Sequence, residues 1–259
     1  KDFAAGLEFL QKMQMEADFP FISANIYDIN GNRLFDPYLV VDIEDISVGI
    51  IGLASTFSHS DVFIQDPIET LGEIIYEVDN QSDLLILMFD SEEIDHSKLQ
   101  NSKFPIDLLI RSKSKTRSQD GGSKGIPSYS CGDRGKYLYQ FDISIIDKDK
   151  EFLDITLYEN KILRAEKQLD KMRQPNMTVD LKTLYKDDPQ SIRKIDTYES
   201  QIINAKLKIE NQQNIIRVKK HELGKAISDR PDIFKLVEKG KSKIVKIHGP
   251  QPPPGTPPG

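Results

Sequence analysis

Tryptophan is absent from this sequence, cysteine occurs once, at Cys131, and only four histidines are present. A single thiol excludes an internal disulfide framework and a zinc site built from several thiolates. Four imidazoles leave little for a metal centre that needs several histidines. The longest apolar runs fall far short of the roughly 18 residues that cross a bilayer, so we expect no transmembrane segment.

The net charge of −6 gives no reason to expect nucleic acid as a partner, because nucleic-acid-binding domains are typically basic. That charge is unevenly distributed along the chain. Residues 1–150 hold 14 basic and 26 acidic residues, which gives a net charge of −12. Residues 151–259 hold 21 basic and 15 acidic residues, which gives a net charge of +6. The opposite charges indicate two structural units. Lys1 is not a natural start and no signal peptide is visible, so we expect a processed chain or part of a longer one.

Helical and strand patterns alternate over residues 1–146. The continuous apolar run Leu84–Phe89 is typical of a strand buried on both faces, and Ile106–Ile110, which is apolar apart from Asp107, is read as another. Asp66 followed by proline is typical of a helix start. These patterns predict an α/β fold, a layered α/β sandwich. In such folds the functional site lies beyond the carboxyl ends of the strands, which here carry acidic and then basic residues.

Residues 151–227 change to a purely helical pattern. Apolar positions from Ile155 to Met172 advance by alternate steps of three and four, which is the pattern of a coiled-coil seam. After a break at Pro175, a second set of apolar residues recurs at intervals of seven: Ile195, Ile202, Ile209, Ile216 and Leu223. We predict an α-helical (coiled-coil) hairpin whose second helix, about 35 residues or 50 Å long, exceeds the first. The excess length favours assembly through this seam, although a purely intramolecular hairpin also explains the heptads.

Two further segments complete the chain. Residues 228–248 predict a short helix followed by an edge strand at Lys243–Ile247, where lysines would act against aggregation. Residues 249–259 are rich in proline and glycine and predict an extended tail, which is either a linker or a strip that a partner holds, and we favour the second.

Several short stretches of residues 1–146 together resemble one family. They are Gly6–Leu10, Phe19–Ile26, Leu34–Tyr38, Val48–Leu53, Ser82–Leu87, Ile106–Ile110 and Gly135–Leu138. In this order and spacing they resemble the calcineurin-like metallophosphoesterase domain of bacterial 5′-nucleotidases, without its N-terminal part. The resemblance implies that fold, two divalent metals that clamp phosphate oxygens, and a periplasmic or cell-surface location.

The resemblance also places the family's metal ligands on this sequence, and those positions are degenerate. Lys1, Lys113 and Lys115 stand where histidines are expected, and Asp90 stands at another ligand position. A lysine ammonium has no lone pair and repels a divalent cation. The family's Asp-x-His motif is expected upstream of Lys1. We therefore expect no catalytic residue and no metal, and keep as the alternative an active metallophosphoesterase that holds a divalent metal pair and hydrolyses nucleotides or other phosphate esters.

The charged segments at the strand ends admit competing interpretations. Four basic residues form either an anion site that replaced the metals or a solvated loop: Arg111, Lys113, Lys115 and Arg117. The acidic residues 90–95 with His96 indicate either a metal site or a solvated face, and a third hypothesis pairs them with the basic residues. We interpret His59 as an isolated loop residue, Cys131 as a small buried residue and residues 121–125 as a flexible loop.

Taken together, the sequence favours a structural or interaction protein. An inactive metallophosphoesterase-like domain at residues 1–146 supplies a rigid body. The hairpin at residues 151–227 and the tail would contact a protein partner or a second copy of the chain in a homo-oligomer.

Overall fold

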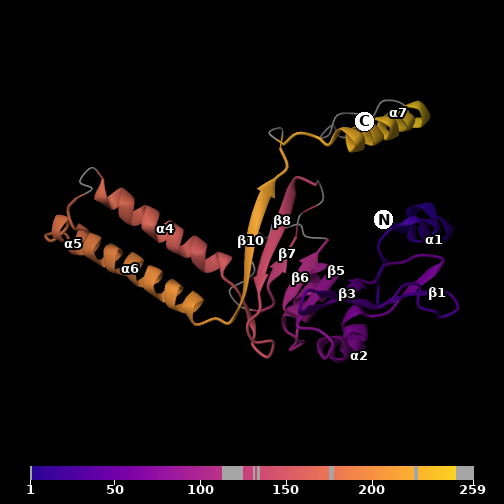
Figure 1. Cartoon of the computed structure of the whole chain (residues 1–259), viewed down its shortest axis with the longest axis horizontal. Coiled ribbons are helices and arrows are strands. Elements are labelled where there is room, and N and C mark those ends of the chain that lie inside the picture. The colour runs from indigo at the N-terminus through magenta and orange to yellow at the C-terminus, as the bar shows by residue number, and fades with distance from the viewer. Residues whose placement is uncertain are drawn as a thin grey trace. The chain divides into compact units, whose positions relative to one another are not determined.

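The computed structural model of the 259-residue chain describes residues 2–112, 125–130, 132, 135–174, 178–224 and 227–248 (Figure 1). The chain divides into two compact units, Lys1–His221 and Glu222–Gly259. The first unit contains an α/β body and a helical arm, and the second contains one long helix. Each unit is described by itself below.

A five-stranded sheet forms the centre of the body. Its strands, in spatial order, are β2 (Tyr38–Ile43), β3 (Ile46–Ala54), β5 (Leu84–Asp90), β6 (Leu108–Arg111) and β7 (Ser128–Tyr129). The last four are parallel, and β2 runs antiparallel to β3. The apolar runs of β5 and β6 are strands, as predicted, and their side chains are mostly buried, although Met88 of β5 is about half exposed.

Helices cover one face of this sheet. Helix α2 (Pro67–Asp79) begins at Asp66, whose carboxylate accepts hydrogen bonds from the backbone N–H groups of Ile68 and Glu69. This confirms the predicted helix start. The apolar stripe of α2 packs onto the sheet beside α3 (Glu93–Gln100) through fully buried side chains: Leu71, Ile75, Val78 and Leu99.

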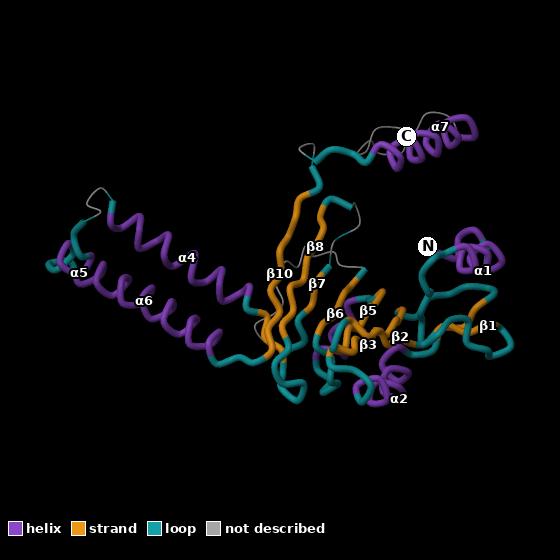
Figure 2. Tube along the Cα trace, in the orientation of Figure 1, coloured by secondary structure: helices purple, strands orange, loops and turns teal. Residues whose placement is uncertain are grey.

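A second sheet covers the opposite face. Its three strands, in spatial order, are β8 (Tyr137–Ser144), β10 (Asn214–Glu222) and β9 (Phe152–Asp154). Ile216 and Val218 of β10 pack against Leu108 and Tyr129 of the central sheet. The ring of Tyr129 meets Phe141 edge-on, with centroids 5.2 Å apart. The helices, the five-stranded sheet and the three-stranded sheet form three layers (Figure 2). This arrangement confirms the predicted α/β sandwich.

Four further elements form a smaller apolar core beside Ala54 at the end of β3. They are η1 (Asp2–Ala5), α1 (Leu7–Glu16), β1 (Ile26–Asp28) and β4 (Val62–Ile64). Strands β1 and β4 pair in antiparallel register. Phe3 and Leu10 pack there against Ile26, Val62 and Ile64, so these elements have an apolar cluster of their own.

The predicted helical hairpin is present as an arm. Helices α4 (Thr156–Arg173) and α6 (Pro189–Glu210) lie side by side, joined through α5 (Leu181–Leu184) (Figure 1). Leu169 of α4 and Ile195 of α6 are buried in one cluster with Leu181. Asp188 accepts hydrogen bonds from the backbone N–H groups of Gln190 and Ser191, which fixes the start of α6.

The second helix of the arm is shorter than predicted. It ends at Glu210, so Ile195, Ile202 and Ile209 lie on α6, whereas Ile216 lies in β10 and Leu223 follows that strand. Ile216 is fully buried between the two sheets. The expected heptad seam therefore stops at residue 209, because residues 214–218 alternate between buried and half-buried positions as a strand does.

This correction changes the domain boundaries. Strand β10 pairs in parallel with β9, in the register Asn214 to Phe152 and Ile216 to Asp154. The body predicted at residues 1–146 therefore includes β9 and β10. The arm is an insertion between two strands of one sheet and not an appendage that follows the body.

The described residues of the second unit contain a single helix where a short helix and an edge strand were predicted. Helix α7 runs from Pro231 to His248 without interruption. The run Lys243–Ile247 has only five residues, too few to tell the two-residue repeat of a strand from the 3.6-residue repeat of a helix. The helix that begins at Pro231 continues through this run. No helix in the described parts of the chain is long and apolar enough to cross a membrane. The tail, residues 249–259, lies outside the described residues.

Candidate functional site at the strand ends

The carboxyl ends of the parallel strands meet at one edge of the central sheet. Ala54 pairs with Asp90 across β3 and β5, and Phe89 pairs with Arg111 across β5 and β6. The residues that follow these strands are therefore neighbours in space although they are far apart in the sequence. Helix α3 begins at the same edge with Glu93. This edge is where the fold class positions functional groups.

A buried arginine occupies the centre of this edge. Arg111 is only 5% exposed. Its Nε donates a hydrogen bond to Oγ of Ser91 at 3.0 Å, and its Nη2 forms an ion pair with Oε1 of Glu93 at 3.1 Å. The side chain of Glu93 is 61% exposed, so one partner of the pair is desolvated and the other is not. The guanidinium is held inward by groups from β5 and α3.

Two serines hold the carboxylates at the same edge. Ser112 donates a hydrogen bond to Oδ1 of Asp90. Ser55 donates a hydrogen bond to Oδ2 of Asp95 at 2.5 Å and accepts one from the backbone N–H of Glu92 at 2.8 Å. The acidic segment is thus tied to the ends of β3 and β6 by neutral hydroxyls.

His96 completes the cluster on α3. Its Nδ1 lies 4.0 Å from Oε2 of Glu93, and its Nε2 lies 3.4 Å from the amide nitrogen of Gln100. Burial and the positive charge of Arg111 lower the pKa of His96, and Glu93 opposes that shift. The imidazole is therefore neutral at neutral pH, and it contributes no positive charge to the edge.

These residues do not fit a divalent metal centre. The described residues contain no group of three or more histidine, cysteine, aspartate and glutamate side chains that could hold a metal ion. Asp90 and Asp95 each accept a hydrogen bond from a serine hydroxyl, and Glu93 of the same segment pairs with the guanidinium of Arg111. The metal interpretation of residues 90–95 with His96 finds no support in this geometry.

The other predicted site residues have mixed outcomes. The hypothesis that basic and acidic strand ends pair is realised for Arg111 and Glu93. Lys1, Lys113, Lys115, Arg117 and Cys131 lie outside the described residues, so the four-residue anion site stays a prediction. His59 accepts a hydrogen bond at Nδ1 from the backbone N–H of Asp61, 3.2 Å away, and its ring lies 5.5 Å from Phe3. That is the geometry of a loop residue and not of a catalytic base.

Sequence reasoning missed the three serines that organise the edge: Ser55, Ser91 and Ser112. Each follows a buried strand by one or two residues, and that position is the only signal in the sequence. Serine is common at strand ends, so its position alone does not identify a functional residue. The role of these serines is visible only in the folded chain, where each hydroxyl binds a charged side chain.

A second polar cluster joins the arm to the body. Asn214 is fully buried, and its side chain binds the backbone of the loop at residues 146–150: its Oδ1 accepts from the N–H of Ile146, and its Nδ2 donates to the carbonyl of Lys150 at 2.7 Å. Arg217 of β10 forms an ion pair with Glu159 of α4, with Nη2 and Oε1 2.8 Å apart. The loop and α4 are thereby fixed to the strand that closes the insertion.

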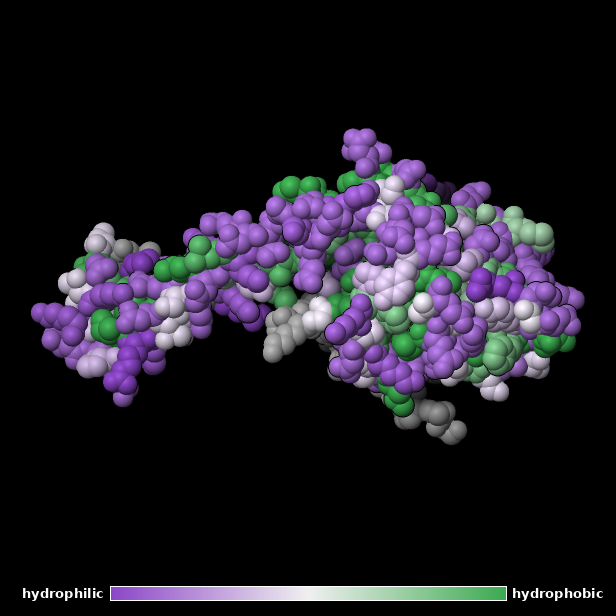
Figure 3. Space-filling view, turned by 90° about the horizontal axis from the view of Figure 1, so that it is seen from below, coloured by the Kyte–Doolittle hydropathy of each residue, from purple (hydrophilic) through white to green (hydrophobic). Residues whose placement is uncertain are grey.

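The backbone of α4 is also tied to β10. The N–H of Ile155 donates to the carbonyl of Ile216 at 2.9 Å, and the hydroxyl of Thr156 accepts from the N–H of Val218 at 2.7 Å. The first turn of the arm therefore has little freedom to rotate against the sheet. Figure 3 shows a mostly hydrophilic arm surface interrupted by separate hydrophobic side chains. Three apolar side chains of the arm are each about half exposed: Leu163, Ile203 and Leu207.

Comparison with known proteins supports the resemblance for part of the chain. No family model matches it. The 5′-nucleotidase of Vibrio cholerae is 46% identical over 55 residues, which are 21% of this chain and 10% of that protein. The uncharacterized metallophosphoesterase YunD of Bacillus subtilis is 26% identical over 148 residues, which are 53% of this chain and 32% of that protein.

Solved structures include similar chains as well. The calcineurin-like phosphoesterase YfkN of Bacillus subtilis superimposes with a TM-score of 0.46 and 21% identity, over 57% of each chain. The chain spans between a tenth and a third of the length of the two curated relatives. Part of this chain is therefore similar to the metallophosphoesterase domain found in 5′-nucleotidases.

Proposed function

We propose that this chain is a structural or interaction protein built on a catalytically inactive metallophosphoesterase-like domain, with the inserted arm as its assembly element. The observation that carries the first half of the proposal is the buried guanidinium of Arg111, paired with Glu93. Two-metal catalysis needs anionic and neutral ligands around divalent cations. A fixed positive charge at the ligand edge opposes such binding by Coulomb repulsion, which a partly desolvated site strengthens.

The carboxylates of this edge support the same interpretation. Asp90 stands at a ligand position by resemblance, and Ser112 donates to one of its oxygens. Asp95 is engaged by Ser55 and lies 3.6 Å from the ammonium of Lys98. A metal would have to displace these contacts and then remain beside a guanidinium. No cofactor is proposed for the chain.

The arm supports the second half of the proposal. Its first helix is fixed to β10 through Thr156 and Glu159 on α4, and its second helix leads into β10 after Glu210. A helix pair held in this way presents its surface in a defined direction, which lowers the entropy lost when a partner binds. A second copy of the chain or another protein would bind to the arm and to the proline-rich tail. We place the protein in the periplasm or at the cell surface, as 5′-nucleotidase-like domains suggest.

Metal content and hydrolysis test the inactive domain. The purified full chain should hold much less than one manganese, zinc or iron ion per molecule by mass spectrometry. It should release no phosphate from nucleotides or p-nitrophenyl phosphate when these metals are added. Stoichiometric metal with metal-dependent turnover would establish the alternative, an active metallophosphoesterase or 5′-nucleotidase acting on phosphate esters.

The insertion determines how the arm has to be tested. Removing residues 151–259 would also remove β9 and β10 and so expose the apolar face of the central sheet. Replacing residues 158–212 by a glycine–serine linker of about eight residues keeps both strands, whose ends are adjacent. We expect the full chain to have a light-scattering mass above its 29.5 kDa, and the linker variant to be a monomer with the same sheet signal in circular dichroism. Unchanged assembly of the linker variant contradicts a role for the arm.

A point variant provides the matched control for that deletion. Leu163→Gln, Ile203→Gln and Leu207→Gln change exposed arm residues and leave the buried contacts of Leu169 and Ile195 intact. If the arm surface mediates assembly, this variant should weaken it without loss of helix content. If assembly survives the point variant but not the linker variant, the contact lies elsewhere on the arm.

A further inference from the structure

Helix α7 exposes an apolar surface to solvent. Ile233, Phe234, Leu236 and Val237 are each between 45% and 64% exposed. A single exposed apolar side chain is ordinary, but four within five residues of one helix are not. Exposed apolar area is unfavourable in water by roughly 25 cal/mol for each Å², so this surface favours an occupant.

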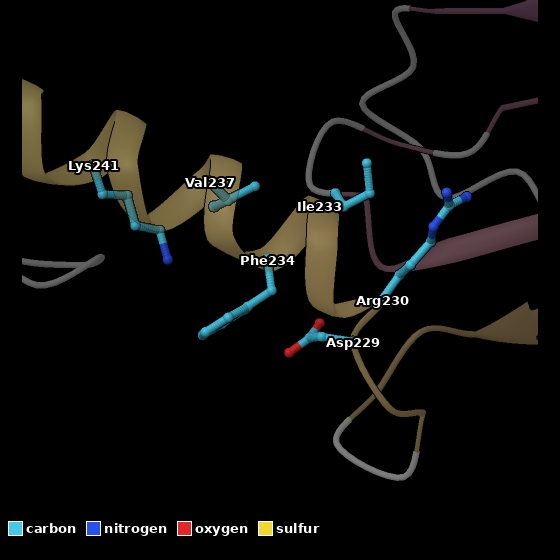
Figure 4. Close-up of a pocket in the computed structure, with 6 residues that line it drawn as sticks. All are labelled: Asp229, Arg230, Ile233, Phe234, Val237 and Lys241. Atoms are coloured by element: carbon cyan, nitrogen blue, oxygen red, sulfur yellow. The ribbon is translucent and has the colours of Figure 1, made fainter.

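The apolar residues line a shallow pocket that charged residues border. Asp229 and Arg230 lie at one end of this pocket and Lys241 lies at the other, with Ile233, Phe234 and Val237 between them (Figure 4). These positions recur at intervals of three and four, so they share one side of the helix. Arg230 pairs with Asp232, and Lys241 pairs with Glu238, which leaves the net charge of the helix positive.

Lysines occupy the other side of the helix. Lys235, Lys239 and Lys243 are all exposed and follow one another at intervals of four. Over residues 231–248 the sequence has five lysines against Asp232 and Glu238. The helix therefore combines an apolar side with a polar side that is rich in lysine, the arrangement of helices that lie flat in a membrane interface.

We propose that α7 binds an anionic lipid membrane by lying in the interface plane, with Ile233, Phe234, Leu236 and Val237 toward the acyl chains. Charge complementarity is the argument for an anionic surface, since Lys235, Lys239 and Lys243 attract acidic headgroups. Lys241 lies on the apolar side, between Val237 and Phe234 around the helix, and its flexible stem lets its ammonium reach the headgroups. This proposal does not depend on the function proposed above.

The width of the apolar arc favours a membrane over a protein groove. Phe234 and Leu236 are two residues apart and so lie about 160° from each other around the helix. A helix in a protein groove buries a narrower stripe at spacings of three, four and seven. A flat interface accommodates both the width and the charge.

Vesicle binding tests the proposal on the full chain. We expect the protein to float with vesicles of phosphatidylglycerol and phosphatidylcholine and to bind vesicles of phosphatidylcholine alone much more weakly. Binding should decrease as salt is raised. The variant Lys235→Gln, Lys239→Gln, Lys243→Gln should reduce the partition coefficient at least tenfold, since one lysine near an anionic surface is worth roughly 1 kcal/mol, or about fivefold. Phe234→Ser with Leu236→Ser should reduce it by a similar factor.

The matched control is Lys167→Gln, Lys171→Gln, Lys208→Gln, which removes three exposed lysines from the arm. It lowers the net charge by the same three units as the α7 variant. It should bind the anionic vesicles as strongly as the unaltered chain does. All substituted residues are exposed, and circular dichroism checks that each variant keeps its helices. Equal binding to both vesicle types, equal loss in the arm control, or no binding to either vesicle overturns the proposal. Absence of vesicle binding together with self-association that the α7 variants abolish assigns the face to a second copy.

Discussion

The hydroxyl of Tyr129, on β7, donates a hydrogen bond to the buried carboxylate of Asp154, at the end of β9. This bond joins the five-stranded sheet to the three-stranded sheet. Asp154 also accepts a hydrogen bond from the backbone N–H of Thr156 at 3.0 Å, where α4 begins. One carboxylate therefore connects the central sheet, the covering sheet and the root of the arm. The arm and the body are consequently expected to unfold together.

The variant Tyr129→Phe tests this connection. It removes a donor from a carboxylate that is only 5% exposed. We expect the free energy of unfolding to fall by about 1–3 kcal/mol, the cost of an unsatisfied buried acceptor. Urea denaturation measures the change. Tyr38→Phe is the control, because the hydroxyl of Tyr38 binds Glu77 at the surface and its loss should cost less than about 1 kcal/mol.

Removing either partner of the Arg111–Glu93 ion pair is expected to lower the free energy of unfolding by a different amount. Glu93→Ala leaves the guanidinium buried without its carboxylate, whereas Arg111→Met removes the buried charge and lets Glu93 return to water. We expect Glu93→Ala to lower the free energy of unfolding by about 1–3 kcal/mol, discounted because Glu93 is itself exposed. Arg111→Met should cost less. Thermal unfolding compares the two variants, with the exposed Glu73→Ala as control. A larger loss in Arg111→Met contradicts the prediction.

The partly buried carboxyl of Asp107 is expected to make the free energy of unfolding decrease as the pH rises. Burial of Asp107 raises its pKa to about 6, a hydrogen bond from the backbone N–H of Leu85 opposes the shift, and the charge of Asp79 adds to it. The unfolded value is about 3.9. The folded state therefore binds more protons between about pH 4 and pH 6, so the free energy of unfolding decreases through that window.

Asp107→Asn should remove this loss, because the amide stays neutral at every pH. Relative to the unaltered chain, the variant should gain about 2–3 kcal/mol between pH 4 and pH 7. Urea midpoints at several pH values measure the gain. Asp79→Asn removes a charge that raises the pKa of Asp107, so it should shift the window to lower pH. A difference between Asp107→Asn and the unaltered chain that does not change with pH contradicts the assignment.

Replacing each of two glycines by alanine is expected to change the stability of the fold in opposite directions. A Cβ at Gly52, in β3, would lie 2.5 Å from the carbonyl oxygen of Ile22, which is backbone and cannot rotate away. Gly52→Ala should therefore destabilise the fold by about 1–3 kcal/mol. At Gly72, in α2, the same methyl would meet Phe104 at an ordinary 3.6 Å. Gly72→Ala should stabilise the helix by about 0.5–1 kcal/mol, and calorimetry separates the two.

Elements with strong local patterns followed directly from the sequence. The apolar run at Leu84–Phe89, the cap at Asp66 and the seam from Ile155 to Met172 each produced the expected strand, helix start or helix. Local periodicity and capping are sufficient there, because the side chains involved lie within a few residues of one another. The acidic and basic strand ends were also visible, and with them the edge of the sheet where a site would lie.

The role of Ile216 was decided only by tertiary structure. Its spacing of seven from Ile209 predicted a helix, but β9, about 60 residues upstream, offers an unpaired edge that a strand can satisfy. The orientation of Arg111 was decided in the same way. The sequence shows a cation at a strand end, whereas Ser91 and Glu93, 18 to 20 residues earlier, turn it inward. Local patterns determine which elements form, but hydrogen bonds and burial between distant residues determine which face each side chain takes, because their partners exist only in the folded chain.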